Sequence, residues 1–206
     1  DLNAWVGLFA EFAECFDIKA DKNKLFSTLY QKAMEGDKDC GGMIACNYYS
    51  GEPVSGLEEG RPMFLRRPDS HLGLANFMRS HLYASLVTLK IGLDILLKEE
   101  DVKIDSITGH GGLFKTKGVG QSILAAAMNA PISVMETAGE GGAWGMALLA
   151  AYMLFKKDGQ SLGDYLDSWV FAERKSETME PDPADVAGFE TYTKQYQACL
   201  AAEKAA

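Results

Sequence analysis

The chain has 206 residues, 47% of them hydrophobic and 24% charged, with a formal net charge of −9 and a pI near 4.9. This composition is typical of a soluble globular protein that forms one large domain or a domain with appendages. The excess of acidic residues excludes a general affinity for nucleic acids or anionic membranes, and the sequence shows neither a signal peptide nor an apolar run of about 18 residues that could span a membrane.

The first half of the sequence predicts helices on either side of a short strand region. Trp5, Leu8, Phe9, Phe12 and Phe16 recur at helical spacing, so the first helix begins almost at the first residue. Natural chains rarely start inside a helix and without Met, and we therefore expect a piece of a longer protein. The expected elements are helices at 5–16 and 21–34, a buried strand at 43–49, a glycine- and proline-rich loop at 50–62, a short strand at 63–65 and a long helix at 73–98 with a broad apolar stripe.

The second half alternates strands and helices, which predicts parallel pairing through crossover helices and an α/β domain. We expect an actin-like, ribonuclease H-like mixed sheet flanked by helices once the resemblance described below is counted. The expected elements are a strand at 102–108, a glycine cluster, a helix at 118–129, a strand at 132–135, a glycine-rich turn at 137–142, an apolar helix at 143–155, a short helix at 161–170, a polar linker at 177–185 and a terminal helix at 189–206.

The cysteines and histidines do not follow the patterns of a disulfide scaffold or a zinc site. Cys15, Cys40, Cys46 and Cys199 form no CxxC pair, so we interpret them as reduced thiols of a cytoplasmic protein. The three histidines have no metal-ligand spacing, and no metal ligand is predicted.

The glycine cluster in GHGGLFKTKGVG, residues 109–120, follows a predicted strand and precedes a predicted helix. It is not a P-loop, because Lys117-Gly118 has the wrong order, and it lacks the third glycine of a dinucleotide fingerprint, where Phe114 stands. Glycines here could form only a tight turn, or they could let a ligand touch the main chain beyond the carboxyl end of a strand. The residues alone leave both interpretations open. A second cluster, Gly139 to Gly142, is assigned to close helix packing, because small residues continue after it.

At this point the sequence resembles the C-terminal half of FGGY carbohydrate kinases, and within them xylulokinases and related ketopentose kinases. The stretch from Gly109 to Met153 fills the family's order of strand, Gly-Gly loop, helix with a Gln, "G-x-P-V" strand and acidic residue before a small-residue helix. Upstream, MRSHLYASL resembles the helix R-A-H-L-Y-R-A-L, and MIACNYYSGE resembles the strand and "Y-L-S-G-E" turn. The resemblance covers nearly all of residues 1–155, and residues 156–206 are expected to be a helical extension of the same domain.

The resemblance implies a kinase in which ATP and a sugar meet between two domains. It places Gly111 and Gly112 against the nucleotide and Lys115 and Thr116 near the adenosine. Asn3 occupies a position where relatives can carry a Gln or Asp facing the nucleotide. The implied cofactors are ATP and Mg²⁺. The implied partners are a small-molecule sugar and the N-terminal kinase domain of a parent chain, and a homodimer is left open.

Several residues depart from the family pattern. His110 stands where many relatives have glycine, Thr88 replaces a Glu of the long helix, and Pro53-Val54 replaces Arg-Thr-Pro in the sugar-site turn. The family's catalytic Asp and first phosphate loop precede the part that begins here, so no catalytic residue is expected in this chain and we predict that it is inactive alone. A non-catalytic regulatory module of the same fold is the alternative function. An oxidoreductase is a weaker alternative, because GxGxxG is missing.

Other side chains have structural interpretations beside the functional ones. His81 is expected to be packed and hydrogen-bonded, Glu52 either caps a turn or contacts substrate, and Glu140 charges the start of the following helix. Lys115 and Lys117 either meet phosphate or are solvated loop lysines.

Overall fold

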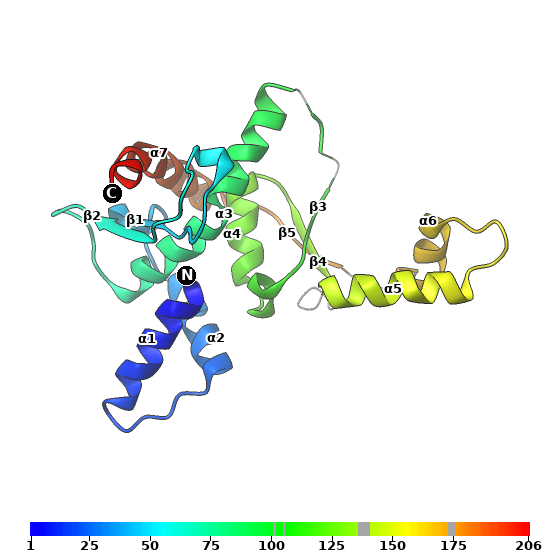
Figure 1. Cartoon of the computed structure of the whole chain (residues 1–206), viewed down its shortest axis with the longest axis horizontal. Helices are drawn as coiled ribbons and strands as arrows, with labels where there is room; N and C mark the ends of the chain where they lie inside the picture. Colours follow the sequence, from blue (N-terminus) through cyan, green and yellow to red (C-terminus); the bar gives the residue numbers. More distant parts are fainter. Residues whose placement is uncertain (101, 105, 136–140, 173–175) are drawn as a thin grey trace.

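The computed structural model describes residues 1–100, 102–104, 106–135, 141–172 and 176–206 (Figure 1). Its first part contains helices α1 (Leu2–Glu14) and α2 (Lys22–Ala33), strands β1 (Met43–Cys46) and β2 (Met63–Arg66), and the long helix α3 (Leu74–Lys98). The three predicted helices of this half are confirmed. The predicted strand at 43–49 is shorter than expected, since pairing with β2 ends at Cys46 opposite Met63.

The second part is built around a three-stranded sheet of β3 (Ile107–Gly109), β4 (Ile132–Met135) and β5 (Ser176–Met179), in the order β3-β4-β5. β3 and β4 are parallel, joined by helix α4 (Val119–Met128), so the predicted crossover is confirmed. β5 is antiparallel to β4, with Ser133 opposite Thr178. The sheet is therefore mixed.

The tail differs from the prediction. Residues 177–185 are not a polar linker, because most of β5 and the start of helix α7 (Pro183–Ala205) lie there. Asp182 caps α7 by accepting hydrogen bonds from the backbone N–H groups of Ala184 and Asp185. The sequence does not predict this strand because it has only four residues, three of them polar, and because its place in the sheet depends on a partner more than 40 residues earlier.

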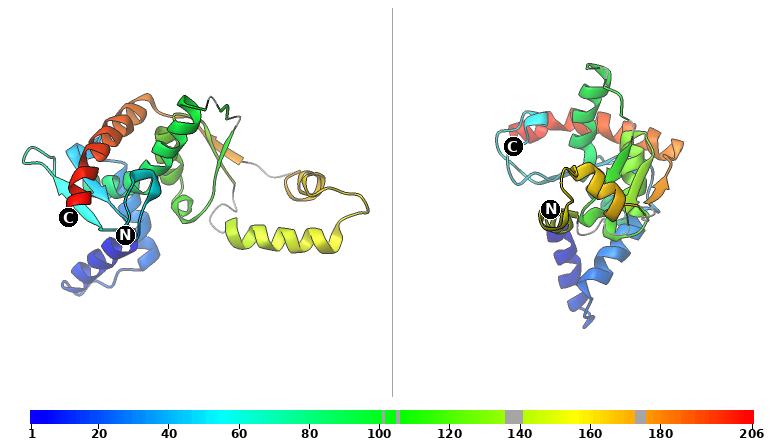
Figure 2. Two further views of the ribbon diagram at one scale, coloured as in Figure 1. Left: turned by 45° about the horizontal axis from the view of Figure 1, so that its top comes forward. Right: turned by 90° about the vertical axis from the view of Figure 1, so that its right-hand side faces the viewer.

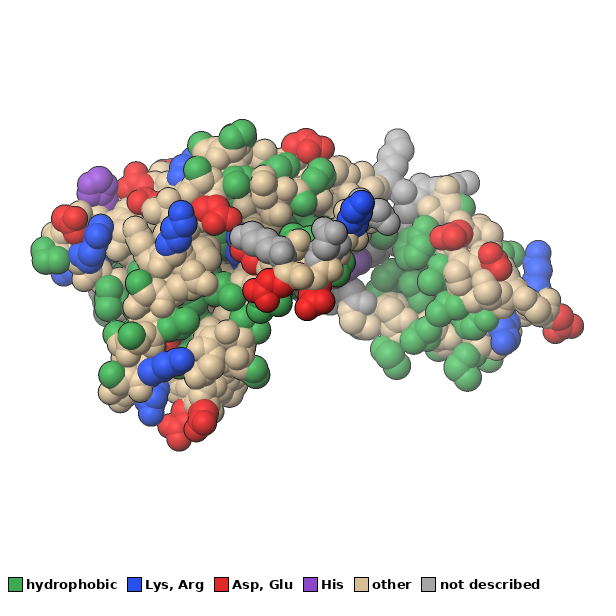
Figure 3. Space-filling view, turned by 90° about the horizontal axis from the view of Figure 1, so that it is seen from above, with side chains coloured by type: hydrophobic (Ala, Val, Ile, Leu, Met, Phe, Trp, Pro, Cys, Tyr) green, Lys and Arg blue, Asp and Glu red, His purple; other side chains and the backbone are tan. Residues whose placement is uncertain are grey.

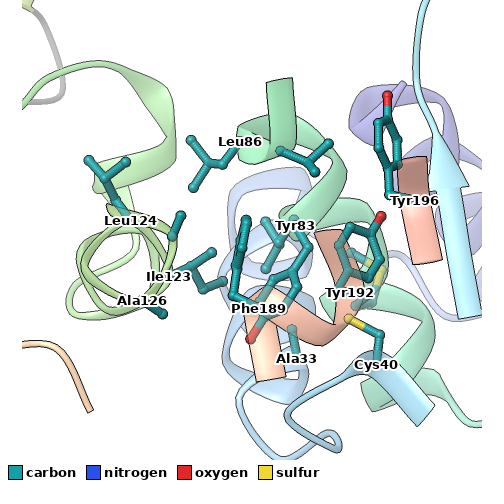
Figure 4. Close-up of a cluster of buried hydrophobic side chains, with 14 of the residues drawn as sticks. Ala33, Cys40, Tyr83, Leu86, Ile123, Leu124, Ala126, Phe189, Tyr192 and Tyr196 are labelled. Carbon is teal, nitrogen blue, oxygen red and sulfur yellow. The ribbon is translucent and has the colours of Figure 1, made fainter. Parts of the chain in front are cut away.

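The core lies where α3, α4 and α7 meet (Figure 4). The ring centroids of Tyr83 and Phe189 are 4.4 Å apart, and those of Tyr83 and Tyr192 are 5.3 Å apart. The Tyr192 hydroxyl lies within hydrogen-bond distance of the carbonyl oxygens of Ala45 and Ser80, which ties α7 to β1 and α3. Helix α7 is thus part of the same core as the first half of the chain.

Helix α3 is long and apolar enough, by length and composition, to cross a membrane, although no single uninterrupted apolar run of that length was visible in the sequence. In the structure it is a core helix. Its side chains Met78, Leu82, Tyr83 and Val87 are fully or almost fully buried against neighbouring elements.

Helix α5 (Gly141–Phe155) leads into a short helical segment, α6 (Leu162–Tyr165) followed by a π-helical turn over Leu166–Val170. Figures 1 and 2 show this pair as a lobe set apart from the other helices. A Cβ added to Gly142 or Gly145 would meet no atom within 4 Å. The prediction of close helix packing at these glycines is therefore wrong for Gly142 and Gly145. Gly139 and Glu140 lie outside the described residues.

Candidate functional site

The glycine loop begins where β3 ends, at Gly109, and its glycines have different roles. A Cβ at Gly109 would lie 2.4 Å from the Phe114 ring, so glycine is needed there for internal packing. A Cβ at Gly120 would lie 2.5 Å from the carbonyl oxygen of Leu113, so glycine lets the first turn of α4 pack against the loop. Packing within the chain therefore accounts for glycine at these two positions.

Gly111 and Gly112 are different, because a Cβ at either position would meet no atom within 4 Å. Gly111 has φ 110° and ψ −177°, a conformation that only glycine adopts readily. Gly112 begins a 3-10 turn over Gly112–Lys115 and does not have positive φ. Neither the backbone conformation nor the packing within this chain requires glycine at position 112. The tight-turn interpretation explains Gly111 and leaves Gly112 unexplained, whereas close approach of a ligand explains both.

Two hollows share lining residues on the strip formed by residues 115–117, since Thr116 and Lys117 line both. The first, of about 490 Å³, is lined by Thr116, Lys117 and Gln121 together with residues of β4 and β5. The second, of about 640 Å³, lies between the same strip and α2, where Gln31 and Lys32 form part of the wall. The strip is fixed to α2 by a hydrogen bond of 3.3 Å from Gln31 Nε2 to the carbonyl oxygen of Lys117.

Lysine side chains bring positive charge to these hollows. Lys115 is exposed and lines the second hollow, and Lys117 lines both. The Lys117 ammonium lies 3.1 Å from the Glu177 carboxylate of β5, and both side chains are largely exposed. An exposed ion pair of this kind is worth at most about 1 kcal/mol, so an incoming anion can replace Glu177 at little cost.

Of the five residues expected at the nucleotide, four lie on one loop. Gly111, Gly112, Lys115 and Thr116 all fall between β3 and α4, and the last two line the hollows. Asn3 is exposed in the first turn of α1 and lines neither hollow. The structure thus brings four of these residues together and does not bring Asn3 to them.

The residues that differ from the family pattern lie in different parts of the structure. His110 is exposed in the loop itself, next to Gly111, whereas Thr88 is half-buried in the middle of α3. Glu52 accepts a hydrogen bond of 3.0 Å from the backbone N–H of Val54, so its turn-capping interpretation is confirmed.

His81 is packed, as expected, between the rings of Trp5, Phe64 and Phe77, with centroid distances of 4.5 to 5.8 Å. The prediction that it is also hydrogen-bonded is wrong, since neither ring nitrogen makes a hydrogen bond; Nδ1 lies 3.3 Å from an oxygen of the Asp1 carboxylate without hydrogen-bond geometry. Burial, with a smaller effect of the N-terminal ammonium, lowers the pKa of His81 to about 4. The ring is therefore neutral at physiological pH.

Gln121 has a structural role at the site that the sequence pattern did not specify. Its buried amide donates hydrogen bonds of 2.7 Å to the carbonyl oxygens of Ile132 and Glu177. It therefore holds β4 and β5 together beneath the first hollow. The sequence pattern includes a Gln early in the helix after the glycine loop, but it does not reveal the partners of this Gln, because they lie on strands whose pairing the sequence does not show.

A buried ion pair between Arg79 of α3 and Asp185 of α7 was also missed. Arg79 is 1% exposed, and its guanidinium also donates to the Tyr83 hydroxyl. Asp185 belonged to the predicted polar linker, so nothing in the sequence marked it as buried.

Comparison with known proteins decides the family. The profile of the FGGY family of carbohydrate kinases, C-terminal domain, matches residues 1–154. The chain belongs to this FGGY family. A search of curated protein sequences found no match.

Solved structures agree with this assignment at the level of the fold. The chain is similar to a ligand-bound xylulose kinase from Lactobacillus acidophilus, with 18% identity and a TM-score of 0.66 over 97% of this chain and 38% of that one. It is also similar to a gluconate kinase from Lactobacillus acidophilus, with 19% identity, a TM-score of 0.66 and the same coverages. A Plasmodium falciparum glycerol kinase with ADP matches at 16% identity, a TM-score of 0.61 and coverages of 96% and 37%.

The predicted fold class is confirmed, since these FGGY kinases have the actin-like ATPase fold. The chain spans well under half the length of the kinases that it matches.

Proposed function

We propose that this FGGY chain is the nucleotide-side part of an ATP-dependent carbohydrate kinase that transfers the γ-phosphoryl group of ATP to a hydroxyl of a pentulose such as xylulose. The observation that carries the proposal is the open main chain at Gly111 and Gly112, where position 112 has no reason within the chain to be glycine. Family membership supplies the class of reaction.

The nucleotide lies against Gly111 and Gly112, with Lys115 and Thr116 beside it in the hollows flanking the strip. Missing Cβ atoms let the phosphates or ribose approach the backbone, and lysine ammonium groups offset their negative charge. Asn3 is the most distant of the proposed contacts, because the nucleotide would reach it only by extending toward α1.

The residues present also fit a magnesium ion held mainly by phosphate oxygens and water. Residues 109–118 contain no carboxylate, and Mg²⁺ bound with a nucleotide commonly takes few protein ligands. Mg²⁺ supplies charge neutralisation at the phosphates when bound. The role of this chain is to bind and orient the nucleotide.

Phosphoryl transfer also needs a base within hydrogen-bond reach of the attacking hydroxyl. That base is expected in the N-terminal kinase domain of a parent chain, a cytoplasmic enzyme in which residues 1–155 form the actin-like domain and residues 156–206 its extension. The solved relatives carry the names xylulose, gluconate and glycerol kinase, so the pentulose is the part of the proposal with least support.

An ADP-release assay with D-xylulose, L-ribulose, gluconate and glycerol tests the proposal. We expect no turnover by the 206-residue chain and sugar-dependent ADP release, fastest with a pentulose, by the longer natural protein. Turnover by the 206-residue chain would show that the base is present in it. Nucleotide binding by the longer protein without phosphorylation of any sugar would favour the regulatory module, for which the exposed His110 beside Gly111 is the supporting observation.

A further inference from the structure

The first hollow beside the 115–117 strip contains a carboxylate as well as a lysine. Among the described residues that line it, Glu177 of β5 is the only acidic one and Lys117 the only basic one. A hollow that takes phosphate groups is expected to present basic groups and hydrogen-bond donors, so the carboxylate needs an explanation. β5 lies outside residues 1–154, which the family profile matches, and residue 177 belonged to the predicted polar linker. Neither the family nor the local sequence therefore pointed to an acidic side chain here.

The sheet fixes the direction of the Glu177 side chain. Glu177 lies opposite Val134 in the antiparallel pair of β4 and β5, and residues directly opposite each other point to the same face. Val134 lines the same hollow, so Glu177 is turned toward it. The neighbouring Thr178 points to the other face, where its hydroxyl lies 2.8 Å from that of Ser133. The Gln121 amide donates to the carbonyl oxygen of Glu177 and thereby holds the backbone at this position.

Lys117 is held from two sides. Its carbonyl oxygen accepts the hydrogen bond from Gln31 of α2, and its ammonium group lies 3.1 Å from the Glu177 carboxylate. The Lys117 side chain is 83% exposed and that of Glu177 is 60% exposed, so solvent screens the pair. The ion pair can therefore be exchanged for a contact between Lys117 and a phosphate oxygen.

The charge around the hollow matters because the protein as a whole does not attract anions. The chain has a formal net charge of −9, and Figure 3 shows acidic and basic side chains interspersed over one face, with no broad basic patch among the residues described there. Individual lysines, rather than the overall field of the protein, must therefore attract a triphosphate. At such a site one carboxylate beside a lysine changes the affinity for an anion.

We propose that Glu177 is a built-in competitor for the phosphate groups of the nucleotide: its carboxylate pairs with Lys117, and the nucleotide displaces it in order to contact this lysine. The inference rests on the proposed function, because it takes the nucleotide to lie against the neighbouring Gly111 and Gly112. After displacement the carboxylate still lies close to the phosphates, and repulsion between like charges adds to its effect. Glu177 is thus a residue that lowers the affinity of the site for nucleotide.

An alternative role for the carboxylate is to hold Mg²⁺, which binds carboxylate oxygens together with phosphates and water. The pairing of Glu177 with Lys117 favours the competitor, because a metal ion on this carboxylate would lie close to the lysine ammonium and be repelled by it. The two roles predict opposite effects of neutralising Glu177, so binding measurements separate them.

Isothermal titration calorimetry of the 206-residue chain tests the proposal, with MgATP and with ATP in the presence of EDTA. The titrations are run at physiological ionic strength, where exposed charges more than about 8 Å apart are largely screened. Glu177→Gln should bind both forms about two- to fivefold more tightly than wild type, the range expected when a competing exposed ion pair is removed. The gain should be larger for ATP without Mg²⁺, because that form carries more negative charge.

The matched control is Glu180→Gln, which removes the same charge from an exposed side chain directly after β5 that lines neither hollow. It should bind both forms like wild type. A double-mutant cycle then tests whether the effect passes through Lys117. Lys117→Gln should weaken binding, and in that background Glu177→Gln should give a smaller gain than in the wild-type background.

The possible outcomes separate this inference from the function on which it rests. Unchanged binding by Glu177→Gln, an equal gain for Glu180→Gln, or a full gain in the absence of Lys117 would each overturn the competitor and leave nucleotide binding intact. Weaker binding of MgATP by Glu177→Gln would overturn it in favour of a Mg²⁺ ligand. If neither wild type nor Glu177→Gln bound nucleotide, the proposed function would be overturned together with this inference.

Discussion

Removal of the Asp185 carboxylate is expected to cost more stability than any other single change to a charged side chain of the core. The Arg79 guanidinium is 1% exposed and pairs with Asp185, which is itself 5% exposed. The remaining hydrogen-bond partners of the Arg79 guanidinium are the Tyr83 hydroxyl and the carbonyl oxygens of Ala33, Met34 and Gly36, the last three at 3.4 Å. None of these partners carries a compensating charge.

The magnitude follows from burial. Breaking a buried pair from one side leaves an uncompensated charge and costs about 3–5 kcal/mol, roughly a fifth or more of the 5–15 kcal/mol stability of a typical domain. Lys38 also lies 2.7 Å from Asp185, but its side chain is 45% exposed. Truncation of Lys38 should therefore cost no more than about 1 kcal/mol. We therefore expect the buried pair of Asp185 with Arg79 to contribute much more to the free energy of unfolding than the half-exposed pair of Asp185 with Lys38.

Urea unfolding followed by circular dichroism measures these costs. Asp185→Asn should lower the free energy of unfolding by about 3–5 kcal/mol and Lys38→Ala by about 1 kcal/mol or less. The double variant Arg79→Met/Asp185→Leu should recover at least half of the Asp185→Asn loss, because it removes both buried charges. A loss within about 0.5 kcal/mol for Asp185→Asn, the range of an ordinary surface substitution, would refute this reasoning.

Three further expectations concern stability. Burial lowers the pKa of His81 to about 4, so this ring should not affect the free energy of unfolding above pH 6.5. As the pH drops toward 4, the free energy of unfolding should fall by up to about 3 kcal/mol, because the unfolded chain binds a proton that the buried ring does not. His81→Phe should remove that part of the acid dependence in urea titrations at several pH values. Gly188→Ala should destabilise the protein by about 2 kcal/mol or more, because its Cβ would lie 2.2 Å from the carbonyl oxygen of Lys38. Gly7→Ala on α1, where an added Cβ meets no atom within 4 Å, should be neutral or stabilising in the same urea titrations. Gln121→Leu should cost about 2 kcal/mol or more, because two carbonyl oxygens lose their donor, and amide hydrogen exchange in β5 should accelerate.

The helices could be predicted from the sequence because their apolar residues recur with a local period. α3 and α4 end within a residue or two of the predicted bounds. The strands were harder, since β3 is only three residues long and β5 is recognisable only through its pairing with β4. The exposure of α5 was also beyond the sequence, because its composition is that of a buried helix.

The candidate site was predictable in part. The order of residues between β3 and α4 placed Gly111, Gly112, Lys115 and Thr116 on one loop, because consecutive residues cannot lie far apart. The different roles of the glycines could not be derived, since they depend on the position of the Phe114 ring and of the backbone near Leu113. The location of Asn3 depends on how α1 packs, which no local pattern encodes.

The dissociation constant of MgATP for Gly112→Val, relative to wild type, tests most directly whether a nucleotide lies against this loop. The substitution adds side-chain atoms where the chain has open space, so folding should be preserved, and the Gly7→Ala variant serves as the matched control. We predict at least tenfold weaker binding by Gly112→Val, about 1.4 kcal/mol or more, with wild-type affinity for Gly7→Ala. Equal affinities for wild type and Gly112→Val, measured by calorimetry on folded protein, would show that the nucleotide does not approach Gly112.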